Sequence, residues 1–312
     1  MKLHAVLTVS VVICAYTERR WQLLLQAVHS LRSQRRYPDQ CIVVIDHNEQ
    51  LLLRARSSLP DDVEIVPNGE CAGLSGARNT GVRAARGDVV AFLDDDAEAD
   101  AGWLEELLGQ YEVPSVVGAG GMAVAVWPGT RPAWLPTEFD WVVGCSYTGL
   151  PERIAPVRNL LGASMSLRRC LFEQFGTFDT EMGRQGALPL GCEETEFAIR
   201  VRHGIPGAEF MHVPNAVVQH HIEPERTGIE YFFRRCYSEG LSKAVVTRRS
   251  GATAALSAER SYVISTLSRG ILRGIGDGFQ GDVNGFARSA MILAGLATTT
   301  AGYLVGIKSF RS

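Results

Sequence analysis

Residues 89–96 read VVAFLDDD, and this stretch decides the fold class that the chain is expected to adopt. Its first five residues are apolar without a break, which is typical of a central parallel strand buried on both faces. Three carboxylates follow at once, at Asp94, Asp95 and Asp96. In an open α/β sheet, ligands bind just outside the carboxyl ends of the strands. The strand is therefore expected to carry three acids to the place where such folds do their chemistry.

The three adjacent acids have two interpretations. Carboxylates this close repel one another unless a positive group lies among them. A hard divalent cation that also holds phosphate oxygens, Mn²⁺ or Mg²⁺, would serve this purpose. In the second interpretation, the acids form a solvated turn at the start of the next helix, where negative side chains are favoured. The triplet alone does not decide between them.

The chain before residue 89 alternates between expected strands and helices. Strands are predicted at 6–15, 41–45 and 63–66, with helices between them and a further helix after the glycine-rich stretch 69–81 (GECAGLSGARNTG). Helical connections of this length imply right-handed crossovers between parallel strands. The glycines follow the third strand and lack the GxGxxG spacing, which argues against a NAD-type dinucleotide site.

The chain after the acids predicts a larger α/β domain followed by a helical extension. Residues 127–141 hold three tryptophans and three prolines, and are interpreted either as a structured loop over a sugar pocket or as a loop pinned by core tryptophans. We expect a mixed sheet flanked by helices over residues 1–225 and a helical extension over 226–312. Further strands are predicted at 116–126, 162–167, 210–213 and 216–220, and helices at 191–202, 231–249, 261–275 and 290–307.

Composition narrows the functional classes. The chain has 312 residues, of which 46% are hydrophobic, and its net charge of −3 argues against a nucleic-acid-binding protein. Seven scattered cysteines without a CxxC pair indicate a reducing, cytoplasmic setting. No run of 18 uninterrupted apolar residues occurs, so no transmembrane helix is predicted. The C-terminal helices are expected either to lie on the inner face of the cell membrane or to cap the acceptor pocket.

Several side chains are expected to converge on one rim of the sheet. Asp46 directly follows the second predicted strand, as Asp94 follows the fourth, and Tyr16 lies just past the first. The Tyr16 ring could stack on a base, Asp46 could accept a hydrogen bond from a base or a ribose, and Arg78 could pair with phosphate or orient an acid. Each residue alone has a structural explanation, such as a helix cap; their common location favours a binding site.

Two further clusters are candidates for chemistry. Glu193, Glu194 and Glu196 start a predicted helix and cannot all share one face, so at least one is expected to project into the site, where it could take a proton from a hydroxyl. Acids at a helix N-terminus are also common without any such role. His220 and His221 are neighbours on a strand and therefore point to opposite faces, so only one of them could reach a metal.

The order of these motifs resembles the family 2 glycosyltransferases, which have the nucleotide-diphospho-sugar transferase (GT-A) fold. The resemblance covers about residues 8–225 and is carried by motifs in a fixed order: CAYTER (14–19), VVID (43–46), GLSGARNTGV (73–82), FLDDD (92–96), GCEETEF (191–197) and the histidine pair. The first motif of the family is usually Pro-x-Tyr-Asn. Here the tyrosine is kept as Tyr16, whereas the proline and asparagine are replaced by Cys14 and Thr17.

The resemblance implies an inverting, metal-dependent sugar transfer from a nucleotide-diphospho-sugar to a glycan or lipid-linked acceptor, as in the synthesis of cell-envelope polysaccharides. Glu194 would be the catalytic base, and His220, with His221 as the alternative, would join Asp96 in holding Mn²⁺ or Mg²⁺. The absence of a Gln-x-x-Arg-Trp motif argues against a processive polymer synthase. The nucleotide sugar would be lined by Cys14, Tyr16, Glu18, Asp46, Arg78, Asp94 and Asp95.

Two alternatives remain open on the sequence alone. A nucleotidyltransferase can share the sheet and the metal-binding acids, but would release pyrophosphate and need no base at Glu194. A non-catalytic nucleotide-sugar-binding scaffold is favoured by the altered first motif and disfavoured by the intact acids and histidines.

Overall fold

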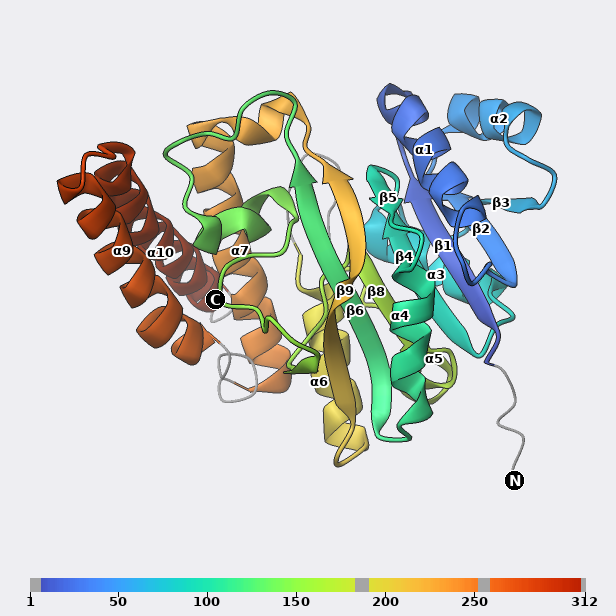
Figure 1. Cartoon of the computed structure of the whole chain (residues 1–312). Helices are drawn as coiled ribbons and strands as arrows, with labels where there is room; N and C mark the ends of the chain where they lie inside the picture. Colours follow the sequence, from blue (N-terminus) through green and yellow to red (C-terminus); the bar gives the residue numbers. More distant parts are fainter. Residues whose placement is uncertain (1–6, 183–190, 252–258, 310–312) are drawn as a thin grey trace.

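The computed structural model describes residues 7–182, 191–251 and 259–309 (Figure 1). Within these residues, nine strands form one mixed sheet in the order β3-β2-β1-β4-β8-β6-β9-β5, with β7 paired to β9. The predicted fold class, a mixed sheet flanked by helices, is confirmed. Its first half is the parallel part that the sequence predicts, with β1 (Val9–Ala15) between β2 (Gln40–Ile45) and β4 (Val89–Asp94), and β3 (Val63–Pro67) at the edge.

Helices cover both faces of the sheet because the central strands are apolar on both sides. One hydrophobic core joins the sheet to α1 (Trp21–Arg32), α2 (Glu49–Ser58) and α4 (Trp103–Gly109). A second core on the opposite face joins it to α3 (Leu74–Ala84), α5 (Cys170–Phe175) and α6 (Glu193–Gly204). The result is a three-layer arrangement in which β4, whose apolar residues are all buried, lies in the middle.

The second half of the sheet mixes directions. Strand β8 (Ser164–Arg168) runs antiparallel to both β4 and β6 (Val116–Val126), whereas β9 (Glu209–His221) runs parallel to β6. Two short strands, β5 (Ala97–Ala99) and β7 (Ala155–Val157), pair antiparallel with β9.

The prediction of two separate strands at 210–213 and 216–220 is wrong, because both belong to β9. The register against β6 jumps from Gly121 opposite Val213 to Met122 opposite Val217. Pro214 lies in this irregularity, and because proline has no N–H to give to the ladder, it is accommodated where pairing is interrupted. The pairing with β6 is thus interrupted where the sequence suggested a break, but the strand continues past this point and ends with His220 and His221.

The tryptophan-rich stretch 127–141 is pinned to the C-terminal helices. It leads into the 3-10 helix η3 (Thr137–Val143), and a hydrophobic core joins Phe139 to Phe232 of α7 (Ile229–Ser250) and Ile292 of α10 (Asn284–Ser309). Trp127, Trp134 and Trp141 are partly buried against this core, as expected of a loop held by core tryptophans, while Trp127 also lines a cavity together with Arg19 and Arg20, as expected of a loop over a pocket.

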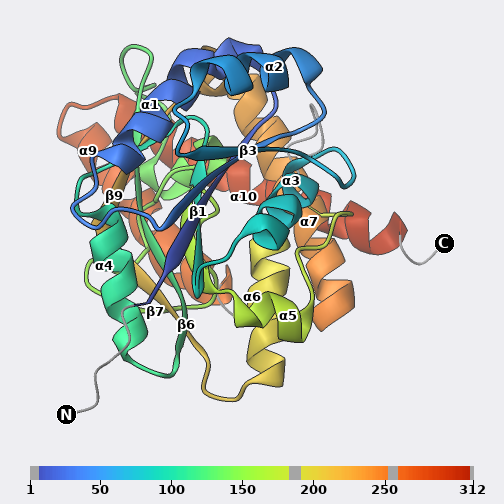
Figure 2. The same ribbon diagram turned by 90° about the vertical axis from the view of Figure 1, so that its right-hand side faces the viewer.

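The C-terminal segment forms a layer of helices on the side of the molecule away from β3. A π-helical turn (Tyr262–Leu267) leads into α9 (Ser268–Phe279), which lies beside α10 at one edge of the molecule (Figure 1). In the side view, α6 and α7 also lie next to each other (Figure 2). By length and composition α10 could cross a membrane: its most apolar 18-residue window has a mean hydropathy of 1.6 and is 28% buried. Threonines and glycines interrupt its apolar residues, so a search for uninterrupted apolar runs does not select this helix.

Candidate active site

Three side chains, two from strands and one from the turn between β4 and β5, meet at the carboxyl end of β4. Asp94 ends β4, Asp96 precedes β5, and His220 lies on β9 opposite Ala97 of β5. One ligand atom of each lies within 4.8 Å of the others, and the Asp96 Oδ1 atom is 3.2 Å from Nε2 of His220. Two carboxylates and an imidazole are a donor set that suits Mn²⁺ among other divalent metals. The described residues therefore include a group that fits the expected cation.

The two adjacent histidines have different surroundings. His220 is buried, with its Nδ1 atom 3.6 Å from the Cys145 thiol and its ring packed against Gly144, whose positive φ of 91° suits glycine. His221 is half-buried on the other side of β9, where its Nε2 atom lies 2.6 Å from Glu98. The pleat of the strand thus places His220 with the acids and His221 away from them.

Arg20 pairs with two acids of the triplet, Asp95 and Asp96, and the sequence analysis missed it. Its Nη1 atom lies 2.8 Å from Asp95 Oδ1 and 2.9 Å from Asp96 Oδ2, and its Nη2 atom lies 2.7 Å from Glu223. Arg226 is 3.7 Å from Asp96. The repulsion among three adjacent acids pointed to a positive partner, but nothing in the spacing showed that Arg20, in the 3-10 helix Glu18–Arg20, supplies it.

These contacts set the protonation of the cluster. Burial alone would raise the pKa of Asp96, but His220 and Arg20 outweigh it and hold that pKa well below its usual range. Burial raises the pKa of Asp95 to about 7 despite the opposing effect of Arg20. Burial would lower the pKa of His220, but Asp96 raises it to about 10. Because a metal binds the neutral imidazole, binding at His220 would release a proton.

The residues expected to line the nucleotide surround the ends of β1 and β2. Tyr16 is 41% exposed just past β1, and the Arg20 guanidinium lies 5.5 Å from its ring centre. Asp46 accepts hydrogen bonds from the Asn68 side chain (2.6 Å) and the Gly73 backbone N–H (2.8 Å), so it also holds the start of α3. Glu18 is exposed in the 3-10 helix that follows β1.

Cys14 lies at the end of β1, directly opposite Asp94 on β4. Burial raises the pKa of its thiol well above the usual range, so the sulfur is protonated and not a metal-binding thiolate. A protonated Cys14 thiol is consistent with a residue that lines the site and takes no part in the reaction.

A fully buried arginine links the acids of β4 to the start of α6. Arg78 on α3 donates a hydrogen bond of 2.6 Å to Glu193, its second terminal nitrogen lies 3.4 Å from Asp94, and the same nitrogen donates to the Gly162 carbonyl at 3.1 Å. The sequence suggested that Arg78 pairs with phosphate or orients an acid, and the structure shows the second arrangement.

Glu194 is the acid of α6 that remains without such a partner. Within the described residues, no ion pair or hydrogen bond joins its carboxylate to the side chain of another residue, and it is half-buried. Burial, reinforced by Glu193 next to it, raises the pKa of Glu194 well above the usual range, against the lowering effect of Arg78. Glu196 instead pairs with Arg200 on its own helix, so the three acids do separate as the sequence predicted.

Comparison with known proteins identifies the family. The model of glycosyl transferase family 2 matches residues 10–176, more than half of the chain. The chain belongs to glycosyl transferase family 2. A glucosyl-dolichyl phosphate glucuronosyltransferase from Haloferax volcanii is 34% identical over 241 residues, which cover 76% of this chain and 77% of that protein. Polypeptide N-acetylgalactosaminyltransferase 4 from Mus musculus is 28% identical over 217 residues. The matched region includes 62% of this chain and 36% of that protein.

Solved structures share the fold of this glycosyltransferase. A mannosyltransferase from Pyrobaculum calidifontis, in complex with GDP-Man and Mn²⁺, aligns with a TM-score of 0.59 at 16% identity, over 95% of this chain and 88% of its own. The GalNAc transferase GalNAc-T7, solved with UDP, GalNAc and Mn²⁺, aligns with a TM-score of 0.55 at 19% identity, over 71% of this chain and 44% of its own. Both are GT-A glycosyltransferases. The family assignment supports a glycosyltransferase over the nucleotidyltransferase and scaffold alternatives.

Proposed function

We propose that this glycosyltransferase transfers a sugar from a nucleotide-diphospho-sugar to an acceptor hydroxyl with inversion at the anomeric carbon. The observation that carries the proposal is that Asp94 belongs to two groups at once. It is part of the Asp94–Asp96–His220 cluster, and through Arg78 it is connected to Glu193, the neighbour of Glu194. One arginine therefore joins a candidate metal site to the residue next to the candidate base.

The donor is proposed to bind across the carboxyl ends of β1, β2 and β4. The solved structures with the same fold contain Mn²⁺ with UDP or GDP-Man, and the donor set here fits such a cation. When bound, a divalent cation would neutralise the charge of the leaving diphosphate. Asp94, Asp96 and His220 would hold it, while Tyr16 would offer an exposed ring to the base and Asp46 an acceptor oxygen to the base or ribose. Mg²⁺ is the alternative cation.

Glu194 is proposed as the base that takes the proton from the acceptor hydroxyl. Among the described residues no arginine holds its carboxylate, and the side chain retains access to solvent. A general base works best when its pKa lies near the working pH, and burial here shifts the pKa of Glu194 upward from the ordinary glutamate value. The deprotonated hydroxyl would attack the anomeric carbon on the side opposite the leaving nucleotide, which gives inversion.

The acceptor is proposed to be lipid-linked and to be met at the cytoplasmic surface of a membrane. The Haloferax relative is a glucosyl-dolichyl phosphate glucuronosyltransferase, so its name points to a lipid-phosphate sugar. In this chain, α9 exposes apolar side chains next to Arg269 and Arg273, the composition of a helix that lies in a membrane interface. The large exposed apolar side chains of this region, which we call the apolar face, are Ile264, Leu272, Ile275, Phe279, Val283, Phe286 and Leu293.

The test combines a donor panel with one variant. Release of UDP or GDP from a panel of nucleotide sugars, with and without Mn²⁺, would identify the donor. With that donor, Glu194→Gln should bind the nucleotide sugar as the wild type does, while transfer falls by about 10²–10⁴-fold. Glu196→Gln is the matched control on the same helix, since Glu196 pairs with Arg200 instead. Wild-type turnover in Glu194→Gln, or retention of configuration in the product, would refute the proposal.

A further inference from the structure

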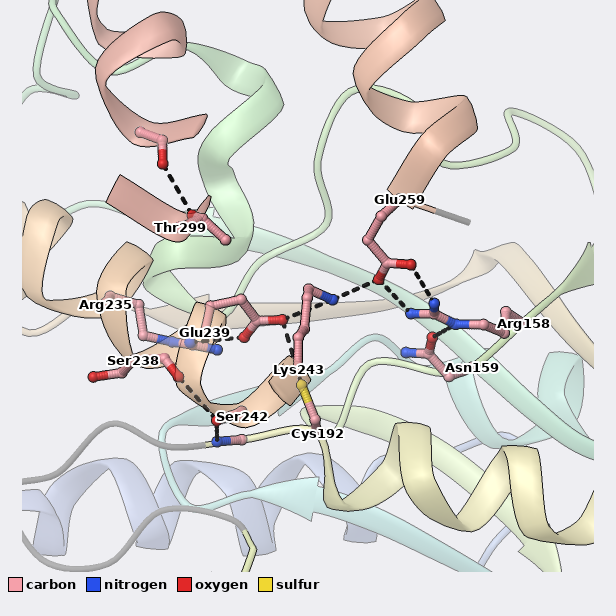
Figure 3. Close-up of polar contacts among 12 residues, drawn as sticks. Arg158, Asn159, Cys192, Arg235, Ser238, Glu239, Ser242, Lys243, Glu259 and Thr299 are labelled. Carbon is pink, nitrogen blue, oxygen red and sulfur yellow. Dashed lines mark hydrogen bonds and ion pairs between the residues drawn. The ribbon is translucent and has the colours of Figure 1, made fainter. Parts of the chain in front are cut away.

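A second cluster of charged side chains is centred on α7, beside the start of α6, and is separate from the residues proposed to hold the donor (Figure 3). Arg158 contacts Glu259 through both terminal nitrogens, at 2.5 and 2.8 Å. Lys243 lies 2.5 Å from Glu259 and 3.1 Å from Glu239, which in turn accepts a hydrogen bond of 2.8 Å from Arg235. We call these five residues the second ion cluster. Arg235, Glu239 and Lys243 are spaced four residues apart on one face of α7.

The second ion cluster has more positive than negative charge. It holds three cations and two carboxylates, and each side chain is only 12–21% exposed. Charges with so little water are costly unless they are compensated, so an excess cation in such a place favours the entry of an anion. The remaining exposure means that the side chains are not sealed in the core. Arg235 is also stacked over Trp141, with its guanidinium 5.4 Å from the ring centre, which holds it in place.

The second ion cluster adjoins the first residues of α6. The Cys192 thiol donates to Glu239 at 3.4 Å, and the Gly191 backbone N–H donates to Ser242 of α7 at 3.1 Å. Glu239 is also one of the charges that raise the pKa of Glu194. Glu194 thus lies close enough to both Arg78 and Glu239 for each of them to shift its pKa.

The cluster also adjoins the helices with the apolar face. Glu259 lies at the start of the segment that continues through the π-helical turn into α9. Arg235 and Lys243 lie on α7, which packs against α10. A ligand held here would therefore lie near both the start of α6, which carries the proposed base, and the C-terminal helices.

We infer that Arg158, Arg235 and Lys243 bind the phosphate group of the acceptor lipid, so that the sugar on that phosphate lies toward Glu194. This inference rests on the proposed function, because it needs Glu194 to face the acceptor. Arginine pairs with phosphate through two parallel N–H···O bonds, and lysine adds a point charge. The phosphate would take over contacts that Glu239 and Glu259 make in its absence.

Binding of a short isoprenyl phosphate, measured by titration calorimetry without donor or metal, tests the inference. Geranyl phosphate is the probe, and geraniol and inorganic phosphate are its two comparison ligands. Arg235→Gln and Lys243→Met should each weaken geranyl phosphate binding by about tenfold or more, because a charge-assisted hydrogen bond is lost. Glu239→Gln, which removes a competing carboxylate, should bind it at least as tightly as the wild type. Arg248→Gln, an exposed arginine on the same helix, is the matched control and should leave binding unchanged.

Three results would overturn the inference. The first is unchanged geranyl phosphate binding in both cation variants. The second is a loss in Glu239→Gln as large as in Arg235→Gln, which indicates a purely structural ion pair. The third is equal affinity for inorganic phosphate and geranyl phosphate, which indicates a free-anion site. Circular dichroism checks the fold of each variant. If Arg235→Gln does not fold, Lys243→Met and Glu239→Gln still decide the test, because the first should weaken geranyl phosphate binding and the second should not. The binding measurement needs no nucleotide sugar. Its outcome can therefore be interpreted even if the transfer assay for the proposed function fails.

Discussion

Arg78 donates a hydrogen bond of 2.6 Å to Glu193 while its second terminal nitrogen lies 3.4 Å from Asp94, so one buried guanidinium joins α6 to the end of β4. Replacing it by glutamine should leave Glu193 buried without its cation. We expect Arg78→Gln to lower the free energy of unfolding by about 3–5 kcal/mol, the usual cost of breaking a buried ion pair, and to abolish transfer. Urea denaturation measures the first effect. Arg83→Gln, at an exposed position of the same helix, should change stability by about 0.5 kcal/mol or less.

Metal binding should distinguish the two adjacent histidines. We expect His220→Gln and Asp96→Asn to weaken Mn²⁺ binding by at least about tenfold, since each removes a proposed ligand. His221→Gln should leave the affinity unchanged, because His221 contacts Glu98 on the other side of β9. Titration of Mn²⁺ in the presence of a nucleoside diphosphate, followed by electron paramagnetic resonance, gives the affinities. A larger effect at His221 than at His220 would contradict the assignment.

The pH dependence of transfer should report the raised pKa of Glu194. Its burial and the neighbouring Glu193 raise this pKa, and a base must be ionised to act. The rate at saturating substrates should therefore rise with pH through the raised pKa and level off above it. Glu194→Gln should lose this rise. A rate that falls with pH over the same interval would be inconsistent with a base at this position.

The raised pKa of Glu194 also affects stability. Whereas the transfer rate should rise with pH, the contribution of this group to the free energy of unfolding should fall. The folded chain holds the Glu194 proton more tightly than the unfolded chain does. The contribution of this group to the free energy of unfolding should therefore decrease as the pH rises above the ordinary glutamate pKa. Comparison of wild type and Glu194→Gln by denaturant unfolding at several pH values isolates it, because the variant lacks the titrating group.

The apolar face, part of which lies on α9, should govern membrane binding. We expect Leu272→Ser combined with Phe279→Ser to lower the partition constant of the protein for anionic phospholipid vesicles, measured by flotation, by about 100-fold or more, since each buried apolar side chain contributes roughly 1.5–3 kcal/mol. Leu53→Ser is the matched control: Leu53 is 60% exposed on α2, on the other side of the molecule from α9 (Figure 1). Equal flotation of the double variant and the wild type would rule out this surface as the attachment site.

The division into residues 1–225 and 226–312 can be tested by truncation. Phe139 and Val142 share a hydrophobic core with Phe232 and Ile292 of the helical extension. A chain that ends at residue 225 should expose these side chains and lose roughly 5 kcal/mol of stability, from the apolar burial of a few large residues. Denaturant unfolding of the truncated chain checks this. Full stability would show that residues 1–225 form an independent domain.

The local pattern of the sequence predicted most of the elements. The apolar runs of β1, β2 and β4, the apolar spacing along α1 and the turn residues between them are properties of neighbouring residues. Because the carboxyl ends of parallel strands meet at one edge, the same pattern also predicted that Asp46 and the acids after β4 lie at one rim. The error at β9 arose because a proline interruption ends local pairing but not the strand.

The sequence by itself determined the central strands, the acids at their ends and the fact that only one of His220 and His221 can face those acids, because all three follow from residue order and strand periodicity. Tertiary structure alone decided which histidine it is, through the pairing of β9 with β5. It also decided that Arg20 pairs with Asp95 and that Glu239 of α7 lies near Glu194 of α6. An ion pair is a matter of distance in space, and residues separated by 75 positions in the chain, as Arg20 and Asp95 are, carry no local sign of their meeting.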